Sequence, residues 1–203
     1  MWDRWTGGFC PTPAAKGGLM ASERDARRRA YLDKAAAEID ALAARGALMG
    51  GNAFSSVLLV KGELTDAEKG GEAPFSGADG TALRASLDRL GYPPEDWAWL
   101  LSVDAEGTPL DAALMREAVC ALDPGMLVCC DEAAADAVRE AYADDLAVIE
   151  RFEEALLAPG VVARVCGMRV LNLGGFAAAL ADPHDKQVMW ARLKQIPPLG
   201  EPF

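Results

Sequence analysis

Short apolar runs along this chain alternate with longer segments in which apolar residues recur every three or four positions. The runs are rich in valine and leucine and are bounded by turn residues, which is typical of strands buried in a parallel sheet. We therefore predict strands over 55–61, 98–103 and 126–130, and a two-stranded hairpin within 161–173 around Gly167.

The segments between these runs have the periodicity of helices. In the first segment, which begins at Ser22, Leu32, Ala35, Ile39 and Leu42 share one face of a helix. The other predicted helices cover 83–90, 109–122, 131 to about 157 with a break near 143, and 184–196.

The order of these elements predicts the fold class. Strands that alternate with helices usually form a parallel sheet that is covered on both faces. We expect an α/β protein with three layers, α/β/α, around a mostly parallel central sheet of about four strands. A chain of 203 residues suffices for one core, so we expect a single domain over 21–203 after a loosely ordered leader over 1–20.

This fold class also predicts where a ligand would bind. In open α/β sheets, ligands lie beyond the carboxyl ends of the strands, where the loops that follow the strands meet. The residues of those loops that could carry chemistry are therefore expected to lie near one another: Glu63, Phe75, Asp104, Gly174 and Gly175.

The loop over 62–80 is the most distinctive of these loops. Glu63 directly follows a predicted strand, where a carboxylate can act as a general base or orient a water molecule. Phe75 is flanked by proline and glycine, and an aromatic ring presented in this way can stack on a planar ligand. Three glycines let the backbone approach a ligand closely: Gly62, Gly77 and Gly80.

A purely structural role is the competing interpretation of this loop. Glycine-rich connections often only turn the chain, and a phenylalanine after a proline often packs into the core. From Gly62 to Gly80 the sequence contains five acids and one lysine, a formal charge of −4 that is unfavourable for binding phosphate. The chain has neither a GxxxxGKS or GxxxxGKT loop nor a GxGxxG motif.

The charge of the whole chain narrows the range of partners. The formal net charge is −11, which disfavours nonspecific binding to nucleic acid, because such binding requires Lys and Arg to neutralise phosphates. The acids are concentrated over 131–154, where nine acids stand against two arginines, whereas 22–46 contains six bases and five acids. A neutral or weakly basic surface elsewhere is still compatible with this distribution.

Cysteine and histidine usage predicts no metal centre and no other cofactor. The five cysteines form no CxxC pair, and His184, expected at the surface where the last helix begins, is the only histidine. The thiols are expected to be small buried groups in a reduced, cytoplasmic protein. No apolar stretch reaches the roughly 18 residues of a membrane span, so we expect no membrane partner.

Part of the pattern resembles a known family. An apolar strand, then "GE", then "PFxGxxG" is similar to the first motif of the uracil-DNA glycosylase superfamily, and closest to its bacterial and archaeal branch with an iron–sulfur cluster. The segments "LDPGMLVCCDEAAADAV" and "LNLGGFAAALADPHDKQVMWARLKQI" resemble later elements of that family, so the resemblance spans about 55–196 and implies its fold. The residues that carry the resemblance are Gly62, Glu63, Pro74, Phe75, Gly77, Gly80, Leu83, Pro183, Lys186, Trp190 and Leu193.

The resemblance implies an enzyme that flips a uracil out of DNA and breaks its glycosidic bond. Glu63 then has the position of the family's motif-one acid, and Phe75 that of its stacking residue. The sequence departs from the family at three places. Gly174 and Gly175 stand where the family has a histidine, Ser102 lies in the segment where it has a base-reading asparagine, and the cluster cysteines have no counterparts. A lost donor of this kind is worth about 2.7–4 kcal/mol of transition-state stabilisation.

Three hypotheses about function follow. The first is a divergent protein with the glycosylase fold but without the standard glycosylase activity, which binds a planar, nucleobase-like ligand or a protein partner at the carboxyl edge of the sheet. The second is an active DNA glycosylase in which Glu63 positions water and Phe75 stacks on the flipped base, and the third is a hydrolase of small nucleosides. If the chain is an enzyme, Glu63 is the candidate catalytic residue. The candidate ligand-binding residues are Gly62, Phe75, Gly77, Gly80, Ser102, Gly174 and Gly175.

Overall fold

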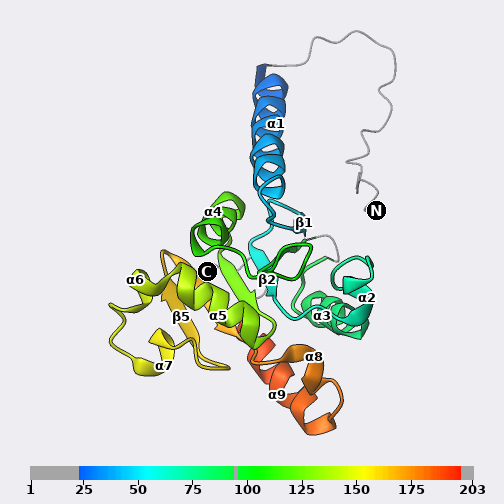
Figure 1. Ribbon diagram of the computed structural model, residues 1–203, viewed down its shortest axis with the longest axis vertical. Coiled ribbons are helices and arrows are strands. Elements are labelled where there is room, and N and C mark those ends of the chain that lie inside the picture. The colour runs from blue at the N-terminus through cyan, green and yellow to red at the C-terminus, as the bar shows by residue number, and fades with distance from the viewer. Residues whose placement is uncertain (1–22, 94–95, 198–203) are drawn as a thin grey trace.

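Six strands form a single sheet in the computed structural model, which describes residues 23–93 and 96–197 (Figure 1). The strands lie in the order β1-β3-β2-β4-β6-β5 across the sheet. The four central strands are parallel to one another, and an antiparallel strand closes each edge. Their bounds are β1 Met49–Gly51, β2 Val57–Lys61, β3 Ala98–Leu101, β4 Met126–Cys129, β5 Val162–Val165 and β6 Met168–Asn172.

This topology confirms the α/β class and corrects the details of the sheet. The sheet is mixed rather than mostly parallel, and the described residues contribute six strands instead of about four. The additional edge strand, β1, has the sequence Met-Gly-Gly, which lacks any β-branched or alternating pattern. The hairpin expected around Gly167 is present, and its two-residue turn at Cys166 and Gly167 has positive φ at both positions.

Helices account for most of the remaining described residues. The predicted helix over 131–157 is divided into three shorter helices, the first of which ends just before Tyr142, close to the expected break. Two one-turn helices, α2 and α8, are too short to leave a periodic pattern in the sequence. The bounds are α1 Glu23–Ala43, α2 Asp66–Lys69, α3 Ala78–Arg89, α4 Ala112–Leu122, α5 Glu132–Ala141, α6 Ala143–Leu146, α7 Phe152–Ala155, α8 Phe176–Ala179 and α9 Pro183–Leu193.

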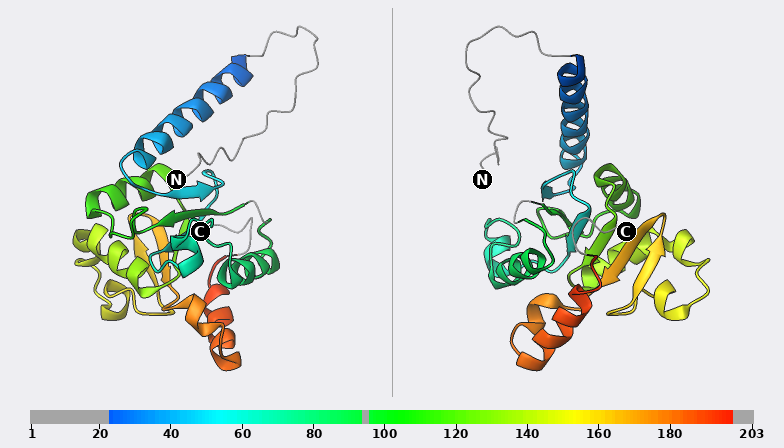
Figure 2. Two further views of the ribbon diagram at one scale, coloured as in Figure 1. Left: turned by 45° about the vertical axis from the view of Figure 1, so that its right-hand side comes forward. Right: turned by 180° about the vertical axis from the view of Figure 1, so that it is seen from behind.

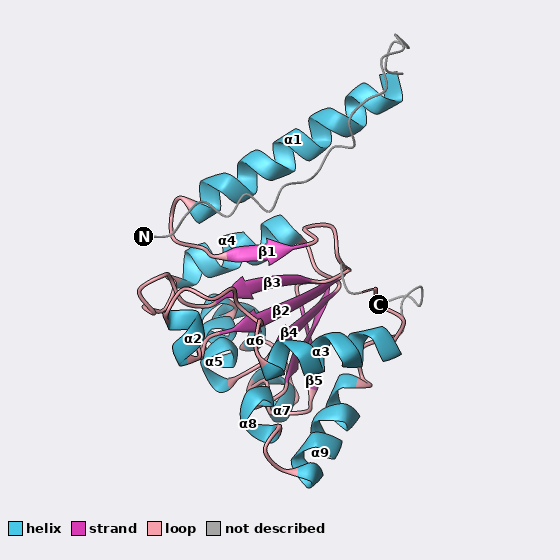
Figure 3. Cartoon of the chain, turned by 90° about the vertical axis from the view of Figure 1, so that its right-hand side faces the viewer, coloured by secondary structure: helices cyan, strands magenta, loops and turns pink. Residues whose placement is uncertain are grey.

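Helices pack on both faces of the sheet because the central strands have apolar side chains on both faces. All five side chains of β2 are buried: Leu58 and Val60 belong to one hydrophobic cluster, and Val57 and Leu59 to the other. The first cluster is completed by α4, α5 and the C-terminal end of α1, and the second by α3, α8 and α9. Figure 3 shows strands β1, β3, β2 and β4 next to one another in this order, among the helices.

Helix α1 differs from the other helices in how little of it meets the core. It extends away from the sheet, as the views of Figures 1 and 2 show. The predicted apolar face is confirmed, since Leu42 is buried and Leu32, Ala35 and Ile39 are half-buried. In the described part of the chain, no helix is both long enough and apolar enough to cross a bilayer. The leader predicted over 1–20 lies outside the described residues.

The register of the parallel strands brings their carboxyl ends to one edge of the sheet. Lys61, the last residue of β2, pairs with Leu101 of β3, and its neighbour Val60 pairs with Cys129 of β4. Cys129 in turn pairs with Asn172 of β6. The loops that follow these four strands therefore begin side by side, as the alternation of strands and helices predicted.

Candidate functional site

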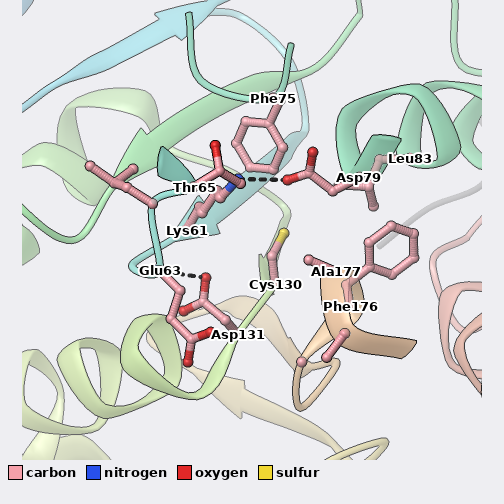
Figure 4. A pocket seen from close by; sticks show the side chains of 13 residues that line it. Lys61, Glu63, Thr65, Phe75, Asp79, Leu83, Cys130, Asp131, Phe176 and Ala177 are labelled. Atoms are coloured by element: carbon pink, nitrogen blue, oxygen red, sulfur yellow. Dashed lines mark hydrogen bonds and ion pairs between the residues drawn. The ribbon is translucent and has the colours of Figure 1, made fainter. Parts of the chain in front are cut away.

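A pocket of about 180 Å³ opens at this carboxyl edge (Figure 4). Its walls come from the loop after β2, the start of α3, the loop after β4, and α8. Lys61, Glu63, Phe75, Asp79 and Asp131 are among the residues that line it. The pocket thus lies between the ends of β2 and β4 and helix α8, which begins more than a hundred residues after the end of β2.

A buried ammonium group is the centre of one wall of the pocket. The side chain of Lys61 is only 3% exposed, and its Nζ donates to both carboxylate oxygens of Glu68 at 2.8 Å and to Oδ2 of Asp79 at 2.6 Å. An ammonium has three N–H groups, so these contacts engage all of them. Figure 4 shows Lys61 and Asp79 directed toward each other beside the Phe75 ring.

Glu68 connects this ammonium to the backbone of the loop. It is the third residue of a capping box, in which the Thr65 side chain accepts from the Glu68 N–H and the Glu68 carboxylate accepts from the Thr65 N–H. The same carboxylate accepts from the backbone N–H of Phe75 at 2.8 Å. A single side chain therefore caps α2, binds the end of β2 and holds Phe75 in place.

The pKa values of this pair follow from their mutual contacts. Burial lowers the pKa of Lys61, but hydrogen bonds to Asp79 and Glu68 outweigh it and raise that pKa above its ordinary value. For Glu68, burial acts to raise the pKa, whereas hydrogen bonds from Lys61, Thr65 and Phe75 outweigh it and leave that pKa below its ordinary value. Both groups are consequently charged at neutral pH.

Phe75 has a constrained position at the pocket. Its backbone has a positive φ of 58°, unusual for an aromatic residue, and its side chain is only 1% exposed. The ring packs edge-to-face against Trp97 with centroids 5.8 Å apart, and Nζ of Lys61 lies 5.1 Å from its centroid. Phe75 therefore serves the core and lines the pocket at the same time.

Asp131 organises the opposite side of the site. It follows β4, caps the N-terminus of α5 by accepting from the Ala134 N–H at 2.8 Å, and also accepts from the N–H groups of Gly62 and Glu63. The loop after β2 is thereby attached to the start of α5. Glu63 itself is exposed, so its carboxylate is free to meet water at the rim of the pocket.

The candidate ligand-binding glycines differ in what they do. A Cβ on Gly62 would lie 2.6 Å from Oγ of Ser102 and 2.8 Å from Cβ of Ala133, and one on Gly80 would lie 1.8 Å from the carbonyl oxygen of Phe75. These two glycines are required by close packing of the chain. Gly175, in contrast, lines the pocket, and a Cβ there would have no atom within 4 Å.

Several residues expected at the site do not line the pocket. Ser102 is buried against Gly62, and Gly77 precedes α3 as its N-terminal capping residue. Gly174 has its N–H bonded to Oδ1 of Asn172 and its Cα beside Pro159. Asp104 closes a turn by accepting from the N–H groups of Glu106 and Thr108. The structure therefore brings Glu63, Phe75 and Gly175 together around the pocket.

Sequence reasoning missed the charged residues of the wall. Lys61, Glu68, Asp79 and Asp131 are all buried, yet in the sequence they look like the exposed charges of an acidic loop. One signal was present, because a lysine that ends an apolar strand run has to be paired where that strand is buried.

Of the described cysteines and the histidine, Cys130 is the residue that lines the pocket. Cys129 and Cys130 are buried as expected, whereas Cys120 and Cys166 are exposed, and Cys10 lies outside the described residues. Burial raises the pKa of Cys130 well above its usual value, and the Asp131 charge adds to the effect, so this pocket thiol is not a nucleophile at neutral pH. His184 is exposed in the first turn of α9.

Comparison with known proteins assigns no family to this chain. Neither a model of a known protein family nor a curated protein matches it. Within residues 23–93 and 96–197, no group of three or more His, Cys, Asp or Glu side chains is arranged to hold a metal ion.

The size and polarity of the pocket limit what it can accept. An apolar cavity of about 150 Å³ holds one benzene molecule, so a pocket of about 180 Å³ has room for a single ring. Three of the residues that line it are acidic, Glu63, Asp79 and Asp131, against the one ammonium of Lys61. This excess of carboxylates favours neutral or cationic groups that donate hydrogen bonds, and it disfavours phosphate.

The close approach of Gly80 to Phe75 predicts that an alanine at Gly80 destabilises the fold much more than an alanine at Gly77. We expect Gly80→Ala to lower the free energy of unfolding by about 3 kcal/mol, because its new methyl group meets rigid backbone. Gly77→Ala, where the nearest atom is a side-chain oxygen at 3.1 Å, should cost about 1 kcal/mol or less. Urea unfolding of both variants checks this, and equal costs would contradict it.

The buried ammonium predicts non-additive effects of substitution. Lys61→Met leaves two buried carboxylates without their cation and should cost about 3–5 kcal/mol. A chain that combines Lys61→Met with Glu68→Gln and Asp79→Asn should be more stable than Lys61→Met alone, because it has no unpaired buried charge. Urea unfolding provides the comparison, and a triple variant less stable than the single one would be inconsistent with this role.

The lowered pKa of Glu68 predicts an acid-dependent contribution to stability. A carboxyl group whose pKa is lower in the folded state stabilises the fold above its unfolded pKa, and this contribution is lost as pH falls through the folded pKa. The wild-type chain should therefore exceed Glu68→Gln in stability at pH 6, and the difference should shrink below about pH 4.3. Urea unfolding at several pH values measures this difference, which would stay constant if the carboxylate were unimportant.

Proposed function

We propose that this chain binds a small planar ring of nucleobase size in the pocket at the carboxyl edge of its sheet. The observation that carries the proposal is the pocket itself, with room for one ring and with Phe75 and Phe176 among its apolar walls. Small-molecule sites in α/β proteins are typically apolar clefts with a few convergent polar groups at this edge. The proposal includes a divergent, three-layer version of the uracil-DNA glycosylase fold, supported by the order of the motif residues around the pocket.

The negative charge of the pocket favours a ligand that carries no phosphate. The carboxylate of Glu63 stands at the loop after β2, where it can accept hydrogen bonds from ring or exocyclic N–H groups. The carboxylate of Asp131, after β4, already accepts from three backbone N–H groups and contributes negative charge to the pocket. A phosphate in the same place would meet an excess of negative charge. A free base or a nucleoside therefore suits the site better than a nucleotide or a DNA strand.

The absence of the standard glycosylase reaction is part of the proposal. That reaction needs a donor for the negative charge that develops on the departing base. Gly174 and Gly175 offer no side chain where the family that the sequence resembles has its histidine, and the only lysine that lines the pocket has all three N–H groups engaged by carboxylates. This arrangement supports binding more than catalysis.

A binding measurement tests this proposal. We expect free pyrimidine bases to bind the wild-type chain more tightly than the corresponding 5′-monophosphates in isothermal titration. Ala177→Phe, which places a ring in the exposed part of the pocket wall, should weaken base binding at least about tenfold. The matched control is Ala181→Phe, an exposed position outside the pocket, which should bind as the wild type does. Undetectable binding of every base, or equal binding by both variants, would refute the proposal.

An active glycosylase is the second candidate, because Glu63 is exposed at the rim of the same pocket that Phe75 lines. A carboxylate in this place could position the water that attacks a glycosidic bond. Release of uracil from single-stranded and mismatched uracil DNA, with Glu63→Ala as the control, distinguishes the two candidates. If uracil is released and the release depends on Glu63, the enzymatic proposal replaces the binding proposal. The same assay with a nucleoside as substrate tests the nucleoside hydrolase hypothesis.

A further inference from the structure

Large apolar side chains are exposed at two separate places on the described surface. Val148, Phe152 and Leu156 are spaced four residues apart in the sequence, and we call these three residues the apolar knob. Tyr31 and Phe54 form the second group. Because Val148 and Phe152 are 79% and 74% exposed, these side chains contribute little to the core, and their exposure suggests contact with another molecule.

The knob is formed by the short helix α7 and the segment before it. The Leu156 N–H donates to the carbonyl oxygen of Phe152, so these two residues are one turn apart and share a face. The surrounding sequence is acidic: from Asp144 to Leu156 there are five acids and one arginine. That arginine, Arg151, is paired with Glu154. From neighbouring helices, Arg116 pairs with Asp145, and Arg139 donates to the carbonyl oxygen of Leu156. Glu150 and Glu153 are exposed and form no ion pair among the described residues.

The second group borders a groove of about 470 Å³ between α1 and the body of the protein. The ring centroids of Tyr31 and Phe54 are 6.0 Å apart, and apolar lining comes from both sides: Ala35, Ile39, Ala53 and Leu122. We call this feature the aromatic groove. It lies at the amino ends of β2 and β4, because residues 53–56 and Gly125 precede those strands, so it is separate from the pocket at the carboxyl edge.

The aromatic groove has a basic flank. From Arg27 to Lys34, helix α1 contains four bases and one acid. Arg28 and Lys34 lie three residues on either side of Tyr31, so they share its face of the helix. Glu38 and Asp123 also line the groove, which leaves the positive charge concentrated along the outer part of α1.

We propose that the apolar knob of one copy of this chain docks in the aromatic groove of another copy. The two surfaces are complementary in apolar character and in flanking charge, since an apolar knob in an acidic segment meets an apolar groove with a basic flank. The groove has ample room for the ring of Phe152. The outer turns of α1, exposed over residues 25–31, would gain in this contact the tertiary packing that a helix in water otherwise lacks.

The proposed contact is head-to-tail. The knob and the groove are different surfaces, with α1 and α7 well apart in the views of Figures 1 and 2. A contact between unlike surfaces leaves one knob and one groove unused at the ends of each assembly unless the copies close into a ring. The assembly should therefore grow with concentration and weaken as salt screens the charges.

Sedimentation of the full chain over a range of concentrations tests the proposal. We expect reversible self-association that weakens as ionic strength rises. Phe152→Glu in the knob and Phe54→Glu at the groove should each weaken it at least about tenfold, as loss of a buried aromatic anchor does. The control Ala181→Glu adds the same charge at an exposed position away from both surfaces and should associate as the wild type does. Circular dichroism confirms that each variant is folded.

Mixing the two defective variants gives the decisive result. The Phe152→Glu chain retains a working groove, and the Phe54→Glu chain retains a working knob, so an equimolar mixture should form complexes of two chains that grow no further. A wild-type chain that stays monomeric at all concentrations would overturn the proposal. Self-association that survives Phe152→Glu, that is insensitive to salt, or that is not recovered in the mixture would overturn it as well.

Discussion

A lysine at the end of a fully buried strand has to find anionic partners, and in this protein that requirement shapes one wall of the pocket. The ammonium of Lys61 lies where water is excluded, and leaving it unpaired would cost several kcal/mol. Its partners come from two helices on the same side, Glu68 from α2 and Asp79 from α3. Because Glu68 also holds the backbone of Phe75, the position of the aromatic ring follows from the position of the charge.

The sequence predicted the parts of the fold that depend on local composition. Apolar runs rich in valine and leucine identified β2 and β4, and two such runs around a glycine identified the β5–β6 hairpin. The three-residue strand β1 was missed because Met-Gly-Gly has no strand preference and is held only by pairing with β3. The antiparallel direction of the edge strand β5 followed from the predicted hairpin, whereas the antiparallel edge at β1 was not expected because the strand itself was not.

The site was predictable only in outline. The edge of the sheet, Glu63 and Phe75 followed from the strand order and the motif, and Gly175 followed from the loop after β6. The charged wall could not be predicted, because partners 7 and 18 residues from Lys61 have no recurring spacing and resemble solvated charges. Gly62 and Gly80 resembled ligand-binding glycines, although their missing Cβ atoms make room for the protein's own chain.

The carboxylate of Asp131 limits the binding of anions at this edge of the sheet. The start of a helix after a parallel strand is where α/β proteins commonly hold an anion, through backbone N–H groups and the helix dipole. In this protein Asp131 already takes that place at α5 and collects the N–H groups of Gly62, Glu63 and Ala134. The chain thus supplies its own intramolecular anion, and a phosphate could bind there only by displacing a covalently tethered competitor at very high effective concentration.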